Sequence, residues 1–236
     1  MPKESKTKFD AEESLRNIGI FESLDDDDIA QLSKQVTWKH YRKGVEVFPY
    51  QQDSNEVYFI GSGRVRVTIY SISGKEISYQ ELGAGEIFGE LAAVDHLPRA
   101  ANVIVTEAAQ IGIMSGKDFW TALSQYPSVS EAIITRLAGL VRFLTERIYQ
   151  FSALDVNQRV RAEVLRLAEQ SQSGDQYVTI QNFPTHVEIA NRVNTHREAV
   201  TKELNELSRL GIIKQSRRVL IVMDIDRLSE LVSEGL

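Results

Sequence analysis

The 236-residue chain contains no cysteine, which excludes disulfides, cysteine-ligated zinc, an iron–sulfur cluster and a thiol nucleophile. Histidine is scarce as well, and no two histidines have the spacing of paired metal ligands, so we expect no metal site. No apolar run is long enough to span a membrane, and the N-terminal residues MPKESKTKFD lack the apolar core of a secretion signal. We therefore expect a cytoplasmic protein that does not bind a membrane.

Basic side chains are fewer than acidic ones in the chain as a whole, but they outnumber them in one segment. The net charge is −6, and residues 1–150 carry 16 Lys and Arg against 21 Asp and Glu. Residues 181–218 reverse the balance, with 7 basic and 4 acidic side chains. An acidic body followed by a basic segment predicts two modules, of which the second is suited to a polyanion.

The first module has the pattern of a β-rich domain. Between about residues 36 and 115, short runs of alternating, β-branched and aromatic residues are separated by glycines. We expect strands at 45–48, 57–60, 65–69, 77–79, 100–105 and 109–114. Many short strands with glycine turns are typical of an antiparallel barrel or roll.

From about residue 128 the apolar pattern becomes helical. Six residues recur at intervals of three and four, as in a coiled-coil seam: Ile133, Leu137, Leu140, Leu144, Ile148 and Phe151. Such a seam needs a partner, and a second copy of the chain would supply one; the alternative is packing against the chain's own barrel. Asp155 then has the place of an N-cap for a new helix at about 156–170.

The basic segment has the pattern of a helix-turn-helix. Thr185 and Glu188 have capping-box spacing, and Thr195 with Glu198 repeats it ten residues later. Asn194 falls at the predicted turn, where a left-handed conformation is usual. The basic run 214–218 between two β-rich runs adds a hairpin, which predicts a winged helix-turn-helix that reads the DNA major groove.

Several residues of this segment are candidates for DNA contact. Arg197 can donate two hydrogen bonds to guanine and Glu198 can accept from cytosine, although Glu198 is equally suited to a capping box. Arg217 at the wing tip can contact a phosphate or lie in an ordinary solvated turn. The complete predicted set is Thr185, His186, His196, Arg197, Glu198, Lys202 and Arg217.

Residues 85–101 of the first module have features of a phosphate site. Gly89 precedes a short helical stretch, where backbone N–H groups can approach an anion. Arg99 adds a permanent charge with a fork that fits phosphate, and Glu90 can accept a sugar hydroxyl. The alternative is that Glu90 and Arg99 simply pair with each other across a loop.

The residues Phe-Gly-Glu-Leu-Ala at 88–92 and Pro-Arg-Ala-Ala at 98–101 resemble the phosphate-binding cassette of cyclic-nucleotide-binding domains, with the same nine-residue step from Glu90 to Arg99. With the seam helix and the winged helix-turn-helix, residues 15–223 resemble the cyclic-AMP receptor protein (catabolite activator)/fumarate–nitrate regulator superfamily of bacterial transcription regulators, in its cyclic-nucleotide-binding branch. The resemblance implies an α+β fold in three parts: an antiparallel β-roll at 1–127, a dimerisation helix and hinge at 128–154, and a winged helix-turn-helix at 155–236.

The resemblance also implies roles for individual residues. Glu90 would bind the ribose 2′-hydroxyl, Arg99 and the backbone N–H groups of Leu91 and Ala92 would bind the cyclic phosphate, and Ala100 would lie beside it. Asp155 would sit at the hinge between domains. The full predicted nucleotide set is Gly89, Glu90, Leu91, Ala92, Arg99, Ala100 and Thr145.

The predicted ligand is cyclic AMP, with cyclic GMP also open. In the bacterial cyclic-AMP receptor a Thr-Ser pair reads the purine, whereas this chain has Leu144-Thr145. The predicted partners are a second copy of the chain, double-stranded DNA with a TGTGA-like palindrome, and RNA polymerase. The alternative is the same fold responding to another metabolite, or binding DNA constitutively. Since no Walker loop, Gly-x-Ser-x-Gly motif or histidine cluster is present, we do not expect an enzyme.

Overall fold

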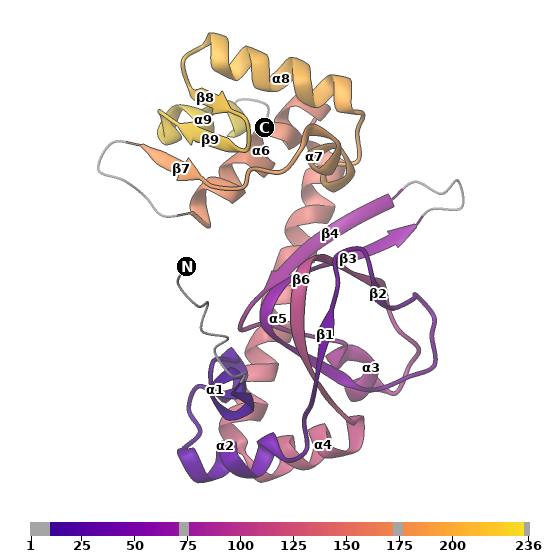
Figure 1. Cartoon of the computed structure of the whole chain (residues 1–236). Coiled ribbons are helices and arrows are strands. Elements are labelled where there is room, and N and C mark those ends of the chain that lie inside the picture. Colours follow the sequence, from indigo (N-terminus) through magenta and orange to yellow (C-terminus); the bar gives the residue numbers. More distant parts are fainter. Residues whose placement is uncertain (1–9, 71–75, 172–176, 234–236) are drawn as a thin grey trace. The chain divides into compact units, whose positions relative to one another are not determined.

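A computed structural model describes residues 10–70, 76–171 and 177–233 of the chain (Figure 1). The chain forms two compact units whose boundary falls inside one long helix, between Gly139 and Leu140. Each unit has its own hydrophobic core. In the described residues no helix is long and apolar enough to cross a membrane, and the predicted cytoplasmic location stays a prediction.

The first unit begins with two short helices, α1 (Ala11–Arg16) and α2 (Asp26–Ser33), joined through a 3-10 turn at Gly19–Phe21. The Asp25 side chain caps α2 by accepting from the Asp28 N–H, and three further aspartates occupy the first turn, where carboxylates complement the positive end of the helix dipole. The apolar faces of both helices are buried in the core below the sheet.

The sheet of the first unit is an antiparallel roll in the order β1-β6-β3-β4, with β2 paired to β6 and β5 paired to β3. Figure 1 shows these strands side by side. Their bounds are β1 Thr37–Tyr41, β2 Glu46–Phe48, β3 Val57–Tyr70, β4 Glu76–Gly83, β5 Ile87–Phe88 and β6 Asn102–Met114. Helix α3 (Glu90–Asp95) lies between β5 and β6, and helix α4 (Gly116–Gln125) follows β6.

Two pairs of predicted strands are in fact single strands. The predicted runs 57–60 and 65–69 both belong to β3, and most of 100–105 together with 109–114 belongs to β6, which begins at Asn102. The register between β3 and β6 shifts three times between Ile60 and Val65, so the extra residues are taken up as bulges and the strands continue. Glycines that look like turns in the sequence therefore bend the strands instead of ending them.

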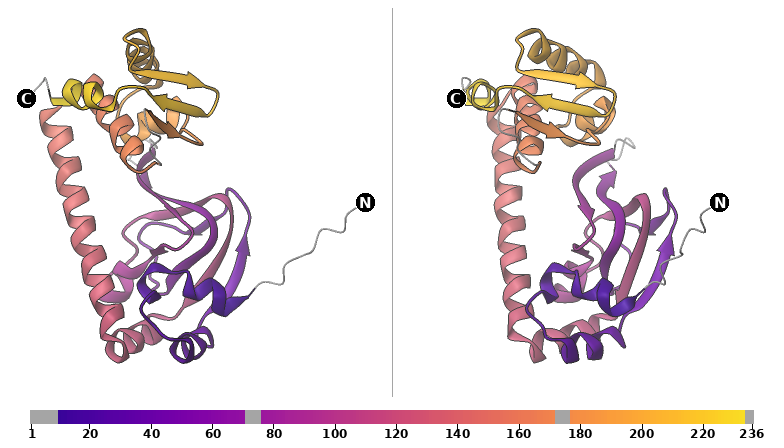
Figure 2. Two further views of the ribbon diagram at one scale, coloured as in Figure 1. Left: turned by 90° about the vertical axis from the view of Figure 1, so that its left-hand side faces the viewer. Right: turned by 60° about the vertical axis from the view of Figure 1, so that its left-hand side comes forward.

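Helix α5 (Pro127–Ala153) is continuous over 27 residues (Figure 2). Its first turns pack on the first unit: Ile133 is buried and Leu137 contacts the same core. The alternative interpretation of the predicted seam was packing against the chain's own barrel. It is confirmed for Ile133 and Leu137. Three other residues of the predicted seam, Leu144, Ile148 and Phe151, are exposed. Ile134 and Val141, which the predicted seam did not include, are exposed as well.

The second unit continues with α6 (Val156–Glu169), β7 (Val178–Ile180), α7 (His186–Arg192), α8 (Arg197–Arg209), β8 (Ile213–Ser216), β9 (Val219–Val222) and α9 (Ile225–Ser233). The three strands pair antiparallel in the order β7-β9-β8. Asp155 caps α6 in a reciprocal capping box with Gln158, which confirms the predicted N-cap. The apolar faces of α6, α7 and α8 meet the strands in one core.

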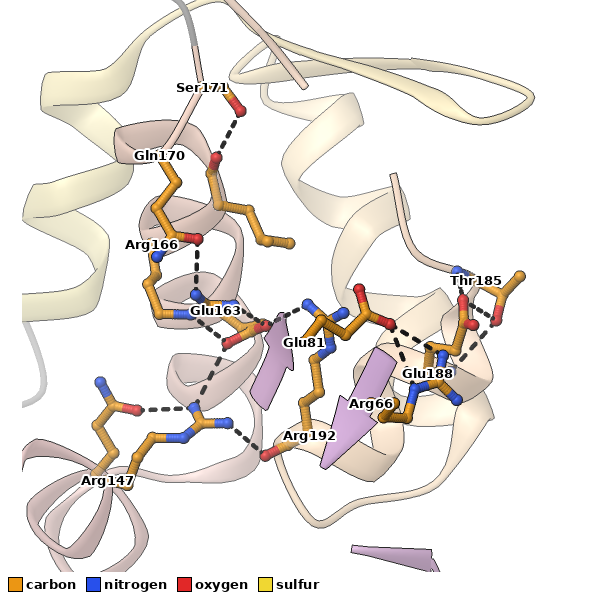
Figure 3. A network of polar contacts seen from close by, with 12 residues as sticks. Arg66, Glu81, Arg147, Glu163, Arg166, Gln170, Ser171, Thr185, Glu188 and Arg192 are labelled. Atoms are coloured by element: carbon orange, nitrogen blue, oxygen red, sulfur yellow. Dashed lines mark hydrogen bonds and ion pairs between the residues drawn. The ribbon is translucent and has the colours of Figure 1, made fainter. Parts of the chain in front are cut away.

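A cluster of buried charges lies within the second unit (Figure 3). The Glu163 carboxylate is completely buried and accepts hydrogen bonds from Arg166 at 2.7 Å, Arg192 at 3.1 Å and Arg147 at 3.5 Å. Burial by itself would raise the pKa of Glu163, but the hydrogen bond and charge of Arg166 and the charges of Arg192 and Arg147 outweigh it. The pKa of Glu163 is therefore lowered from its ordinary value of 4.5.

Replacing Glu163 by glutamine should destabilise the second unit at neutral pH and change its response to acid. Removing one partner of a buried ion pair costs about 3–5 kcal/mol. Because the folded-state pKa is lowered, the stabilisation is complete above the unfolded pKa and disappears as the pH falls through the folded pKa. Urea unfolding followed by circular dichroism should give a large difference between Glu163→Gln and the wild type at pH 7 that shrinks below pH 4.5.

Glu206→Gln is the matched control, because Glu206 also has a lowered pKa, caused by its hydrogen bond with Arg209, but on the exposed surface of α8. It should leave stability unchanged. Trp38 and Trp120 both lie in the first unit, so their fluorescence transition should be the same in all three proteins. A constant difference across the pH range would show that Glu163 is not ionised in the folded protein.

Candidate functional site

The predicted phosphate cassette forms a tight strand–helix turn in the first unit. β5 ends at Phe88, and Gly89 adopts a left-handed conformation with φ of 82° as it caps α3. A Cβ atom at this position would lie 2.8 Å from a guanidinium nitrogen of Arg99 and 3.0 Å from the Glu56 carbonyl oxygen. Only glycine fits here without strain, and the first N–H groups of α3 are presented without a side-chain cap.

Arg99 is the most enclosed residue of the cassette, with 1% of its surface exposed. Its guanidinium donates to Ser54 Oγ at 2.8 Å, to the Gly89 carbonyl at 2.9 Å and to the Glu56 carboxylate at 3.1 Å. The fork thus joins the segment before β3 to the turn before α3. Glu56 is the more accessible of the two charged partners, with 42% of its side chain exposed.

An aromatic face supports this guanidinium. The Arg99 Cζ lies 4.2 Å from the centre of the Phe48 ring and 5.5 Å from that of Tyr58, so the cation is in contact with ring faces. Burial lowers the pKa of Arg99, while the charge and the hydrogen bond of Glu56 act in the opposite direction. The site therefore holds a fixed, desolvated cation, which attracts an anion more strongly than a solvated one.

Glu90, the first residue of α3, is buried with 5% exposure and contacts Arg136 of α5. The Arg136 Nε donates to the Glu90 carboxylate at 3.3 Å, and a terminal nitrogen donates to the Ile87 carbonyl at 2.6 Å. Arg136 thereby fixes the carboxylate and compensates its charge. The pairing of Glu90 with Arg99 that the sequence left open is wrong, because each has a different charged partner.

Four predicted nucleotide residues, Gly89, Glu90, Leu91 and Ala92, lie in the turn and first part of α3. Arg99 and Ala100 follow in the segment between α3 and β6, and the Arg99 side chain returns to the Gly89 carbonyl. Sequence reasoning missed Ser54, Glu56 and Arg136, which hold the two charged groups in place. Ser54 and Glu56 lie more than 40 residues from Arg99, so no local spacing could reveal them. Arg136 could have been found from the sequence, because a charged residue between the apolar seam residues Ile133 and Leu137 suggests a partly buried ion pair.

Thr145, the seventh predicted residue, belongs to the second unit. It is exposed on α5, and its hydroxyl donates to the Val141 carbonyl at 2.9 Å. Its contact with the purine stays a prediction.

The helix-turn-helix of the second unit has the predicted geometry around its turn. Thr185 and Glu188 form the capping box of α7, and Asn194 has the left-handed φ of 50°. Ala190 of the first helix and Val193, its C-cap, are buried with Val200 of the second helix. The turn therefore holds α8 against α7 with its opposite face exposed.

One predicted cap is wrong, and the correction changes the status of Glu198. Helix α8 begins at Arg197, with His196 in the N-cap position, and Thr195 is buried with its N–H donating to the Ala190 carbonyl. No capping box forms at α8, because Glu198 is one position too early in the helix. Arg197, Glu198 and Lys202 are all exposed on α8, as a DNA-reading face requires.

His186 points to neighbouring elements of its own unit. Its Nδ1 lies 2.7 Å from the Thr201 hydroxyl, which itself donates to the Arg197 carbonyl, so Nδ1–H must be the donor. Its Nε2 then accepts from the Gln215 side chain of β8 at 3.4 Å. The ring links α7 to α8 and β8, whereas Thr185 is exposed at the start of α7.

The wing is the β8–β9 hairpin, in which Ser216 pairs with Val219. Arg217 and Arg218 form its two-residue loop, and Arg217 takes a left-handed φ of 52°. Both side chains are exposed. The predicted basic-tipped hairpin is thus confirmed, and its phosphate contact stays a prediction.

Two family models match the chain, one to each module. Residues 38–126 match a cyclic nucleotide-binding domain, and residues 158–231 match a Crp-like helix-turn-helix domain. The first match contains the whole cassette, and the second contains α7, α8 and the wing.

Similar proteins extend over most of the chain. A CRP-like cAMP-activated global transcriptional regulator of Mycobacterium tuberculosis is 27% identical over 220 residues, which cover 92% of this chain and 98% of that protein. A CooA mutant of Carboxydothermus hydrogenoformans has a similar structure, with a TM-score of 0.76 and 23% identity over 84% of this chain and 88% of that one. The c-di-GMP responsive regulator CLP of Xanthomonas campestris has a TM-score of 0.72 and 18% identity over 85% of this chain and 100% of that one.

Both modules occur in the order predicted from the sequence, and the relatives span nearly the full chain. The chain belongs to the cyclic-AMP receptor protein/fumarate–nitrate regulator superfamily of DNA-binding transcription regulators.

Proposed function

We propose that the protein is a cyclic-nucleotide-dependent transcription regulator that acts as a homodimer on a TGTGA-like palindrome. The observation that carries the proposal is the cassette, in which the buried guanidinium of Arg99 bonds the Gly89 carbonyl next to the buried carboxylate of Glu90. A cyclic nucleotide carries the two complementary groups, a phosphodiester anion and a ribose hydroxyl. RNA polymerase as a further partner stays a prediction from the family resemblance.

The residues of the cassette fit this ligand chemically. The phosphate would accept from Arg99 and from the N–H groups of Leu91 and Ala92 in the first turn of α3. The Arg99 fork already donates to Ser54, Gly89 and Glu56, and an anion can take the place of one of these acceptors. Glu56 is the suitable one to leave, because its carboxylate is half exposed and would repel the phosphate. Glu90 would accept the ribose 2′-hydroxyl while Arg136 holds it in place.

The purine preference is less constrained than the phosphate site. Leu144 stands where the bacterial cyclic-AMP receptor has a hydroxyl, and it is an exposed apolar side chain here. Thr145 keeps one hydroxyl for the base edge. We therefore propose cyclic AMP as the ligand with cyclic GMP as the competitor, and the c-di-GMP responsive relative of the same fold shows that the fold alone does not choose between ligands.

The exposed stripe of α5 supports a homodimer. Ile134, Val141, Leu144, Ile148 and Phe151 are exposed. With the partly buried Leu137 they follow one another at spacings of three and four, the a and d positions of a heptad. Ile134, Val141 and Ile148 each expose more than 60% of their surface. This register replaces Ile133 and Leu140 of the predicted seam by their neighbours, because Ile133 is in the core. Two such helices side by side would remove the stripe from water.

The dimer would place two recognition helices on successive turns of a palindrome, about 34 Å apart. Arg197 would donate to a guanine, Glu198 would accept from a cytosine, and Lys202 would contact a base or a phosphate. Thr185, His196 and Arg217 flank this face and would contact the DNA backbone. A nucleotide can favour this arrangement only if it binds one dimer conformation more tightly than another.

A band-shift assay on a TGTGA palindrome tests the switch and the DNA assignment together. The wild type should bind more tightly with cyclic AMP than without it. Glu90→Gln should weaken this response, because the amide oxygen can still accept a hydrogen bond but carries no charge to pair with Arg136 or to strengthen the bond from the sugar hydroxyl. Arg197→Ala should lose about 1–3 kcal/mol of discrimination between the palindrome and a scrambled duplex.

The control on the same helix is Arg209→Ala, since Arg209 is exposed on α8 but paired with Glu206. It should leave sequence preference unchanged. Equal affinity with and without nucleotide would contradict the switch, and absence of DNA binding would contradict the DNA assignment.

Gly89→Ala and Gly44→Ala separate a general backbone effect from a specific loss of the phosphate site. Both glycines have a left-handed φ, of 82° and 86°, so an alanine at either costs about 1–2 kcal/mol. Only at Gly89 does the new methyl group also collide with Arg99 and Glu56; at Gly44 nothing lies within 4 Å. Calorimetry with cyclic AMP and cyclic GMP should show affinity lost in Gly89→Ala and kept in Gly44→Ala. Equal losses would place the effect outside the cassette.

Val141→Glu should break the dimer, because it places a charge at the middle of the exposed stripe. Sedimentation should give a mass near the 26.7 kDa of one chain instead of twice that value. The matched control is Arg142→Glu, an exposed neighbour outside the a and d positions, which should stay dimeric. A monomeric wild type, or equal dissociation of both variants, would contradict the proposed interface.

A further inference from the structure

The buried cluster around Glu163 joins three helices of the second unit (Figure 3). Arg147 comes from the end of α5, Glu163 and Arg166 come from α6, and Arg192 is the last residue of α7. The Glu163 side chain has no exposed surface, and Arg147 and Arg192 are each 9% exposed. None of the predicted DNA or nucleotide contacts uses these residues.

The cluster also holds the backbone at the end of α7. Arg147 donates to the Arg192 carbonyl at 2.7 Å, and Arg159 donates to the Val193 carbonyl at 3.1 Å. Arg159 further donates to the Leu154 carbonyl at 2.8 Å, at the break between α5 and α6. The carbonyls of residues 192 and 193 immediately precede the Asn194 turn, so these arginines fix the point from which the recognition helix α8 starts.

Buried charges resist displacement in a way that apolar contacts do not. A carboxylate without solvent is stable only while its donors stay in hydrogen-bonding position, so a small shift of Arg147 is costly. Apolar residues at the same place could slide past one another with little loss. The cluster is therefore suited to hold a fixed angle between the end of α5 and the turn before α8.

We propose that Arg147 and Glu163 are positioning residues that make the last turns of α5 part of the DNA-binding unit and set the orientation of α8 relative to the α5 axis. The inference rests on the proposed function, because in an α5-paired dimer this orientation determines the half-site spacing that two recognition helices can reach together. Arg147 acts here through the Arg192 carbonyl and Glu163 and touches no DNA.

Arg147→Met and Arg166→Met form a matched pair for the test. Each removes one guanidinium from the same carboxylate, but Arg147 comes from α5 whereas Arg166 is three residues from Glu163 on α6 itself. The full-length proteins are titrated with a single half-site duplex and with palindromes whose half-sites are moved apart in steps of one base pair. Arg147→Lys is added as a variant that keeps the charge without the planar fork.

All proteins should bind the single half-site within about twofold of the wild type. The substituted residues are distant from the DNA contacts, and the effects of distant sites are independent of one another. The preference of the wild type for its best palindrome spacing should fall about tenfold in Arg147→Met, the size expected for a lost interaction between contacting groups. Arg147→Lys should show a partial loss, and Arg166→Met should keep the wild-type preference. Unchanged spacing preference in Arg147→Met, or an equal loss in Arg166→Met, would overturn the inference.

Hydrogen–deuterium exchange of the same proteins without DNA measures directly how firmly the contacts of Arg147 and Glu163 hold the end of α5 to the end of α7. The amides of residues 193–196 and 154–156 should exchange at least about tenfold faster in Arg147→Met than in Arg166→Met, because local opening follows the lost contacts. If the wild type failed to bind any palindrome, the proposed function would be wrong, and this exchange ratio would still decide the role of these contacts. Equal exchange in the two variants would overturn it.

Discussion

Helix α5 packs on the core of the first unit and forms ion pairs with Glu90 of the cassette and Glu163 of the second unit. The geometry of the cassette and that of the helix-turn-helix unit both depend on these contacts. At 3.6 residues per turn, neighbouring side chains point about 100° apart, so Ile133 can be buried while Ile134 is exposed. On the same helix Arg136 fixes the cassette carboxylate Glu90, and Arg147 reaches the buried Glu163. The exposed apolar stripe consists of the α5 side chains that take part in none of these internal contacts.

The buried charges Arg99 and Glu163 differ in sign and in the accessibility of their partners. In the first unit a guanidinium, Arg99, lies among acceptors, and one of these, Glu56, is half exposed. That partner can be exchanged for a ligand anion, which makes the arrangement suited to binding. In the second unit a carboxylate, Glu163, is enclosed among guanidinium groups and has no exposed surface. No ligand can reach it without unfolding, which makes that arrangement suited to holding helices in place.

Patterns local in the sequence predicted local structure well. The Asp155 cap, the left-handed Asn194 and the capping box of Thr185 follow from interactions within four residues, and all three are confirmed. The strand boundaries near Gly61 and the second capping box at Thr195 are wrong for a common reason. In each case the tertiary partner decides: β6 carries β3 through its bulges, and Thr195 is buried under the turn instead of capping α8.

The sequence by itself determined the order of the modules, the spacing of the cassette residues, the turn of the helix-turn-helix and the place of the predicted DNA contacts on its second helix, because each depends on spacing along the chain. Only the tertiary structure decided the partners of the buried charges. Glu56 for Arg99, Arg136 for Glu90, and Arg147 for Glu163 are between 16 and 46 residues away in the chain. Such pairs form when folding excludes water from distant segments at once, and no periodicity in a sequence records which segments those are.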